Sequence, residues 1–430
     1  MLTIVVLALL HISIILGIDR RNLVSPLNAV LALIWIMVIR ATELTVFGES
    51  IYPDWVRPYM SDSLILEASL VLSIFLACFL PSYFLLSFAC SNEKKGFEEA
   101  RIDVAPPKLL IFGMATAGMV CAAQFFSQLE EVTDIILQKT SEGVFEGNGL
   151  MIAGISLLPA AILGALLSCH TKRGFAVGSV LLLLIASAVY MPLGQRGNIF
   201  TFVIIALIIS TAKFGHFDLK WTIAAGIALL LCLELAVIWR TTLRYGYEGE
   251  LSDLLVVANA LDGVDRGEFD GLAGIVAHRV SINLDSWWEF TEQLIPRAML
   301  PFKREYMAVS YLVNQEVTGS ASAGFTASIV GTLFAQAGWV GVALSGVILG
   351  GLMQFTQRWF TTNPCSSIGV LTRGVALVFV FFLARNGDLT NVLIMLIVNL
   401  SGVFVLISGL AFLPLWRSTW RSHLAHADSC

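Results

Sequence analysis

Two arginines stand in very short polar turns between long apolar stretches. Arg196 lies in the sequence LGQRGN (193–198), and Arg385 lies in LARNGD (383–388). A guanidinium group binds phosphate oxygens through two parallel hydrogen bonds and stays charged when partly desolvated. Ionisable residues at such positions usually face a cavity, or alternatively extend their charged end to the membrane surface. Together with Arg297, in the apolar context LIPRAML (294–300), these arginines predict a site for an anion such as a lipid diphosphate.

Two residues are candidates for the base that accepts a proton from an attacking hydroxyl group. His278 is the one histidine in the predicted outer loops, and on a helix it would share a face with Asp285. It is alternatively a histidine at the membrane surface. Asp388 follows Arg385 in the same turn, and the alternative for this pair is a simple ion pair.

Further candidates for substrate binding lie in the long polar segment between the apolar stretches. Arg240, Arg279 and Lys303 would add positive charge, and Trp287 and Trp288 would stack on sugar rings. Both tryptophans are alternatively anchors at the membrane surface, where this residue is common.

Several classes of site and partner are excluded by the sequence. No P-loop, no aspartate pair of the nucleotide-sugar enzymes and no His/Cys group with metal-ligand spacing occurs. We therefore expect no metal and no cofactor. The formal net charge of −5 argues against nucleic acid as a partner. None of the 7 cysteines falls in a predicted outer loop, so no structural disulfide is expected.

The elements that position these residues are predicted to be membrane-spanning helices. Of the 430 residues, 57% are hydrophobic and only 13% are charged, against roughly 25% charged residues in soluble domains. The mean hydropathy is +0.82. A helix of about 20 apolar residues crosses a bilayer, and eleven candidate spans occur: 1–18, 23–40, 63–90, 108–126, 151–169, 175–194, 199–212, 221–239, 323–355, 374–384 and 389–413. The composition predicts an all-α, polytopic integral membrane protein.

The distribution of lysine and arginine predicts the orientation. Alternate loops hold fourteen basic residues, whereas the short loops on the other side hold five. Cytoplasmic loops carry an excess of these residues, so we expect the N-terminus outside and the C-terminus in the cytoplasm.

One polar segment, residues 240–322, is far longer than an ordinary connection and is expected to be functional. Apolar residues recur at helical spacing in 272–295, which predicts a helical cap on the outer face of the bundle. The predicted organisation is therefore 1–239 with eight spans, the outer loop 240–322, and 323–430 with three spans and a short cytoplasmic tail.

Four stretches, in this order, resemble motifs of the bacterial O-antigen polymerases and related oligosaccharide repeat-unit polymerases (Wzy type). They are GQRG (194–197), IPRAMLPFK (295–303), SASAGFTASIVGTLFAQAGWVG (320–341) and RNGD (385–388). The resemblance covers about residues 190–400. The family often has a glutamate after the glycine where this chain has Gly331-Thr332, so no acid is assigned there.

The resemblance implies a multi-pass, GT-C-like glycosyltransferase of the bacterial inner membrane that uses neither metal nor cofactor. It would move a growing glycan from undecaprenyl diphosphate onto an undecaprenyl-diphosphate-linked repeat unit at the periplasmic face, within the lipid bilayer and with a possible chain-length regulator protein as partner. Arg196, Arg297 and Arg385 would stabilise the charge that develops on the leaving diphosphate. Two alternatives stay open: an O-antigen ligase with the same donor, and a flippase or other transporter of the lipid-linked oligosaccharide. Against a transporter, the two halves show no internal repeat.

Overall fold

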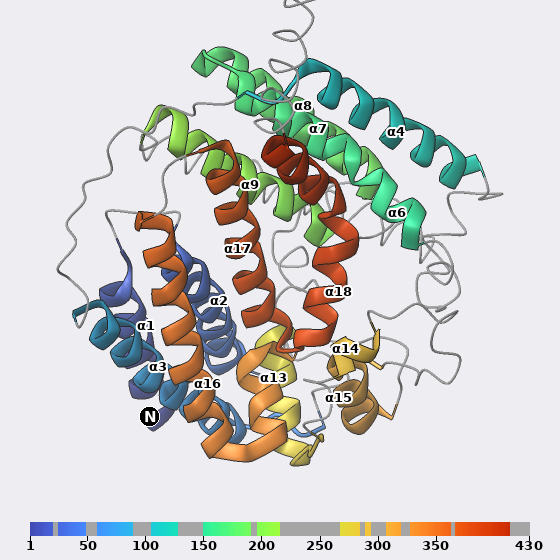
Figure 1. The fold of residues 1–430 in the computed structure, drawn as a ribbon. Coiled ribbons are helices and arrows are strands. Elements are labelled where there is room, and N and C mark those ends of the chain that lie inside the picture. The colour runs from blue at the N-terminus through green and yellow to red at the C-terminus, as the bar shows by residue number, and fades with distance from the viewer. Residues whose placement is uncertain are drawn as a thin grey trace, which may run out of the picture. The chain divides into compact units, whose positions relative to one another are not determined.

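The computed structural model describes residues 1–19, 25–48, 58–88, 105–127, 149–190, 196–215, 267–283, 289–293, 307–319, 327–362 and 366–412. All regular secondary structure in these ranges is helical (Figure 1). Eight of these helices are long and apolar enough to cross a membrane, and a bent pair makes up to nine. The prediction of an all-helical, multi-pass membrane protein is confirmed.

Ten of the eleven predicted spans coincide with helical residues, and the other, 221–239, lies outside the described residues. The first of the ten is a 16-residue apolar helix that is shorter than a full span. The labelled helices are α1 Leu2–Gly17, α2 Pro26–Phe47, α3 Asp62–Phe88, α4 Lys108–Ser127, α6 Gly149–Ile155, α7 Leu157–Ser168, α8 Lys172–Tyr190, α9 Arg196–Phe214, α13 Gly267–His278, α14 Glu289–Gln293, α15 Val309–Thr318, α16 Ser328–Thr362, α17 Ser367–Asn386 and α18 Leu389–Asn399, after which residues 401–412 form a further helix.

The chain folds into two compact units. Unit 1 comprises Met1–Lys95, Glu248–Thr361 and Phe379–Ile394, and unit 2 comprises Gly96–Tyr247, Thr362–Val378 and Met395–Cys430. Three of the boundaries fall within helices: at the end of α16, within α17 and within α18.

In unit 1, α3 and α16 pack closely because two glycines of α16 face the backbone of α3. A Cβ atom at Gly346 would lie 2.7 Å from the carbonyl oxygen of Phe75, and one at Gly350 would lie 2.6 Å from that of Phe79. This G-x-x-x-G spacing places both glycines on one helix face, as is common where membrane helices approach closely. Any larger residue at either position would separate the two helices.

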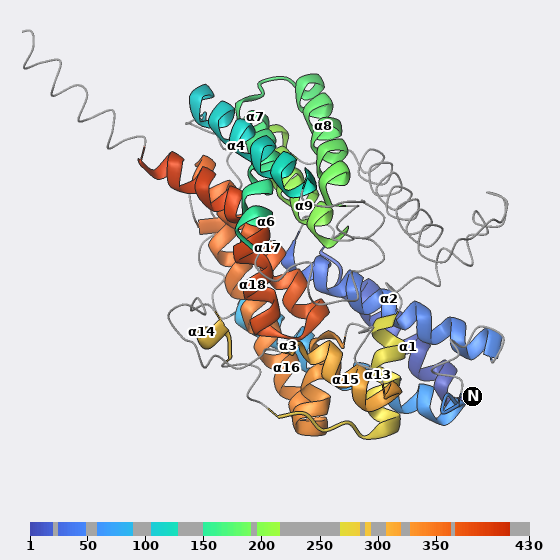
Figure 2. The ribbon, with the colours of Figure 1, turned by 90° about the vertical axis from the view of Figure 1, so that its right-hand side faces the viewer.

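The same unit encloses α13, which comes from the segment predicted to form an outer cap. Phe269, Leu272 and Val276 of α13 belong to the buried cluster that also contains side chains of α2 and α3. Figures 1 and 2 both show α13 beside α3 and α15, with which it is in contact. The apolar face predicted in this segment is thus used inside the core of unit 1.

The predicted amphipathic run over 272–295 is not one helix. It is interrupted after His278, where α13 ends and a turn leads into residues 280–283, which have no helical structure. The shared helix face expected for His278 and Asp285 is therefore not formed, and Asp285 itself lies outside the described residues.

Unit 2 contains α4 and α6–α9, and one contact links two interrupted spans. The helix 401–412 meets α18 at a bend of 63°. At this bend the Ser401 hydroxyl lies 2.8 Å from that of Ser156, which separates α6 from α7, and the Gly402 N–H donates to the Ser156 hydroxyl (2.8 Å). A Cβ atom at Gly402 would collide with the Ser156 carbonyl. Glycine is therefore required for this close approach.

Candidate functional site

A pocket of about 790 Å³ opens in unit 1, and this volume is typical of small-molecule sites, which span roughly 300–1,000 Å³. It lies where the start of α3, the C-terminal end of α13 and a break in α16 meet. Its walls combine charged and polar groups with aromatic rings, among them Tyr59, Glu67, Arg279, Phe334, Gln336 and Trp339. We call it the α13 pocket.

α16 is interrupted where it forms one wall of the pocket. Ala337 (φ −144°, ψ 17°) and Gly338 (φ 58°, ψ −145°) leave the helical conformation, and the second conformation is one that glycine adopts without strain. Just before the break, the carbonyl of Ala335 accepts a hydrogen bond from the N–H of Ile282 (3.1 Å). The residues that follow α13 are thereby held against α16, which closes this side of the pocket.

Arg279 is the basic residue of the α13 pocket, and its backbone is strained. Its φ of 49° is in the left-handed region, which costs an L residue about 1–2 kcal/mol. The N–H of Arg279 bonds to the carbonyl of Val276 (3.3 Å), and that of Val280 bonds to the carbonyl of Ile275 (3.1 Å). These two bonds form a Schellman motif, in which glycine is the usual residue at the position of Arg279. Because the arginine side chain is exposed, packing does not account for it, and such an outlier is a candidate for function.

Glu67 supplies a carboxylate to the same pocket. It lies in the second turn of α3, directly after three apolar residues, and it is exposed toward the pocket space. The residue was missed in the sequence, although an acidic residue within a predicted span is itself a signal of function. A carboxylate and a guanidinium group thus border one cavity.

Three aromatic rings complete the walls, and a fourth lies next to them. Trp339 is 41% exposed, and its ring contacts that of Phe334 edge to face (5.4 Å between centroids). Tyr59 contacts the ring of exposed His278 in the same manner (4.8 Å). Burial, and then the negative charge of Asp270, raise the pKa of the Tyr59 hydroxyl. Tyr59 is therefore neutral at physiological pH and suited to contact with a neutral ligand such as a sugar.

The N-terminal end of α13 is held by two ion pairs, one fully buried and one in which the arginine is 21% exposed. Asp270 accepts from Arg40 of α2, with Nη2–Oδ2 at 3.2 Å and Nε–Oδ1 at 3.3 Å, and both side chains are at most 4% exposed. Glu268 accepts from Arg385 of α17 (Nε–Oε1, 3.1 Å). Removing one partner of a buried pair costs about 3–5 kcal/mol, because the other charge is left uncompensated. Neither pair was predicted, since the partners lie more than one hundred residues apart in sequence.

The RNGD turn between α17 and α18 is shaped by its glycine and its aspartate. Gly387 has a φ of 65°, and a Cβ atom there would collide with the Ser328 carbonyl and the Thr332 hydroxyl. Asp388, which is buried, accepts from the N–H of Asn391 (3.0 Å) and from that of Val309 at the start of α15 (3.0 Å). These bonds make Asp388 the N-cap of α18 and a link to α15.

Some of the predicted site residues lie at the α13 pocket, and others lie elsewhere in the structure. Arg279 lines the α13 pocket, and His278 contacts the Tyr59 ring of its wall. Arg385 and Asp388 lie in the same unit, in contact with α13 and α15 respectively. Arg196 is the first residue of α9 in unit 2. The remaining predicted residues lie outside the described residues: Arg240, Trp287, Trp288, Arg297 and Lys303.

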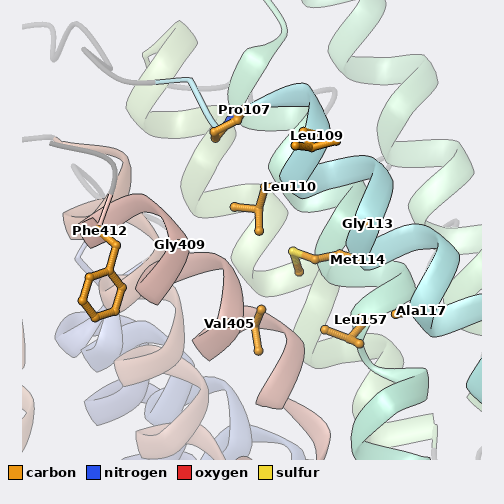
Figure 3. Close-up of a pocket in the computed structure, with 10 residues that line it drawn as sticks. All are labelled: Pro107, Leu109, Leu110, Gly113, Met114, Ala117, Leu157, Val405, Gly409 and Phe412. Carbon is orange, nitrogen blue, oxygen red and sulfur yellow. The ribbon is translucent and has the colours of Figure 1, made fainter. Parts of the chain in front are cut away.

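A second, apolar groove of about 590 Å³ lies in unit 2 between α4 and the helix 401–412 (Figure 3). Its ten lining residues, which include Leu110, Met114 and Phe412, carry no charged side chain. One of the lining residues, Leu109 of α4, is largely exposed, as is Phe112 of the same helix. It offers no group for acid–base or anion chemistry, in contrast to the α13 pocket.

Among the described residues, no group of His, Cys, Asp and Glu has an arrangement that would hold a metal ion. In comparisons with known proteins, no protein-family model, no curated protein and no solved structure matches the chain.

Proposed function

We propose that the chain is a membrane-embedded glycosyltransferase that polymerises an oligosaccharide carried on a lipid diphosphate, with the α13 pocket as its reaction site. The observation that carries the proposal is the combination in one pocket of a strained arginine, a carboxylate and exposed aromatic rings. The four motifs that resemble repeat-unit polymerases, together with the polytopic fold, support the same reaction class and the periplasmic face as its location.

Each group of the pocket has a role in this reaction. The hydroxyl oxygen of the acceptor sugar attacks the anomeric carbon of the donor, and its proton passes to Glu67, with His278 as the neighbouring alternative. The bond between the anomeric carbon and the diphosphate oxygen breaks, and the electron pair leaves with the lipid diphosphate. Arg279 stabilises the negative charge that develops there, which is often the largest contribution of such a site. Trp339 and Tyr59 offer apolar faces to the sugar rings.

This assignment changes the predicted roles of two residues. Arg385, expected at the diphosphate, forms an ion pair with Glu268 of α13, and Asp388, a candidate base, accepts two backbone N–H bonds. We therefore give the charge-stabilising role to Arg279 and the role of base to Glu67.

The test is a polymerisation assay with the purified protein in lipid nanodiscs and one lipid-diphosphate-linked repeat unit as its sole substrate. A ladder of products supports the proposal, and Glu67→Gln and Trp339→Ala should reduce its rate at least tenfold. Glu316→Gln, an exposed carboxylate on α15 away from the pocket lining, is the matched control and should leave the ladder unchanged. Transfer that occurs only after addition of a lipid A core acceptor would instead identify a ligase.

A carrier for the same lipid-linked glycan is a second candidate, because interrupted helices are typical of transporter binding sites. The relevant observations are the break of α16 at Ala337 and Gly338 and the 63° bend after α18. A carrier would move the lipid-linked glycan across proteoliposomes without forming a glycosidic bond. That result, combined with no ladder, would replace the polymerase proposal.

A further inference from the structure

The two ends of α13 have different surroundings. Its C-terminal end, with His278 and Arg279, borders the pocket, while its first turn carries two buried carboxylates, Glu268 and Asp270, into ion pairs. The helix has 12 residues, which corresponds to roughly 18 Å at 1.5 Å per residue. A helix of this length is rigid, so a shift or rotation of its first turn also displaces the groups at its other end.

The apolar contacts of α13 do not by themselves fix its position. Phe269, Leu272 and Val276 are fully or almost fully buried, but hydrophobic burial is not directional. The ion pairs are directional, and they attach α13 to two different spans, α2 through Arg40 and α17 through Arg385. Two attachments from different spans fix both the rotation of the helix and its position along its axis.

The attachment to α2 is the more constrained of the two. Arg40 contacts both carboxylate oxygens of Asp270 through Nε and one of them through Nη2 (3.2–3.3 Å), and Nη1 of Arg40 lies 3.7 Å from Glu43. Buried ion pairs are seldom the most stable choice, since apolar residues of similar size often replace them without loss of stability. Their presence here is better explained by the position that they impose on α13.

We propose that Arg40 and Arg385 are positioning residues, which act through Asp270 and Glu268 on α13 and thereby set the location of Arg279 in the pocket. The proposal rests on the proposed function for its effect on catalysis, but the attachment of α13 can be measured without any substrate. Arg385 thus contributes to the reaction without contact with the substrate.

The decisive variant replaces a whole ion pair by apolar residues, Arg40→Met together with Asp270→Leu, so that neither charge of the pair stays buried without the other. We expect a folded protein with a melting temperature at or above that of the wild type. We also expect kcat to fall at least tenfold with KM changed less than threefold, because the substrate still binds but Arg279 is misplaced. Hydrogen–deuterium exchange of the amides of residues 267–278 should become at least tenfold faster.

The controls separate this proposal from the proposed function. Arg279→Gly should lower kcat about 10²–10³-fold while exchange in α13 becomes no faster than in the wild type, and Glu316→Gln should change neither. A doubly apolar variant with wild-type kcat and wild-type exchange would overturn the positioning role. If the wild type makes no polymer at all, the proposed function fails, and the exchange of α13 alone still decides the attachment. If the doubly apolar variant does not fold, Asp270→Asn, which preserves size, is judged by the same two measurements.

Discussion

Replacement of Arg279 by glycine separates stability from activity in a way that few substitutions do. The wild-type residue holds a φ of 49° at the end of α13, and the left-handed conformation costs an L residue about 1–2 kcal/mol. Glycine removes this strain, but it gains conformational freedom in the unfolded chain, which offsets about 0.4–1 kcal/mol. Because the arginine side chain is exposed, little packing is lost. The net expectation is a gain in stability of about 0.5–1 kcal/mol.

The same substitution removes the cation of the α13 pocket. Loss of one group that stabilises developing charge typically lowers kcat about 10²–10³-fold, and we expect a decrease of this size. Thermal unfolding in detergent measures the first effect, and polymer formation from a lipid-linked repeat unit measures the second. Arg279→Lys keeps the charge and the strained backbone, so it should retain the wild-type stability and recover only part of the rate, because an ammonium group makes no bidentate contact with a diphosphate.

Two results would contradict this reasoning. A less stable Arg279→Gly protein would show that the side chain, rather than the backbone strain, dominates at this position. A variant that is more stable and still forms polymer at the wild-type rate would remove Arg279 from the reaction, and with it the main support for the pocket as the reaction site.

Three further substitutions test the packing. Asp388→Ala removes the cap of α18 and leaves a buried backbone N–H at the start of α15 without this acceptor, so it should destabilise the protein by about 2–4 kcal/mol, measured by chemical or thermal unfolding. Gly350→Ala should sharply reduce the folded yield in size-exclusion chromatography, whereas Gly351→Ala, where a Cβ atom meets only Leu86 at 3.5 Å, should behave as the wild type. Gly402→Ala should lower the melting temperature because of the collision at the 63° bend. Its control is Gly113→Ala on α4, which has open space around it and should leave the melting temperature within about 2 °C of the wild type. Equal melting temperatures for the two variants would contradict the packing of this bend.

The spans could be predicted because they depend on composition alone. A run of apolar residues long enough to cross a bilayer is a local property, and ten of the eleven runs correspond to helical residues. The start of α2 also has a local signal in the sequence, because Ser25 caps the helix through the N–H of Asn28 (3.1 Å) and Pro26 takes its first position. The end of α13 was not, because arginine stands where glycine would have marked the turn.

The partners of buried charges could not be predicted. Arg40 is the last residue of the predicted span 23–40, and it is 2% exposed and bonded to a carboxylate 230 residues away. Nothing in one sequence pairs Arg40 with Asp270 and Arg385 with Glu268, because both pairs depend on α13 lying inside unit 1.

The ion pair of Arg385 changes what a mutation at this residue would mean. If Arg385 contacts the diphosphate, as the sequence predicts, Arg385→Ala should abolish polymerisation because that contact is lost. The pair with Glu268 gives the same expectation for another reason, since α13 would lose its attachment to α17. Loss of activity in Arg385→Ala therefore fits both explanations and supports neither. The two explanations separate in the hydrogen–deuterium exchange of residues 267–278, which should stay at the wild-type rate if only a diphosphate contact is lost and become faster if α13 loses its attachment to α17.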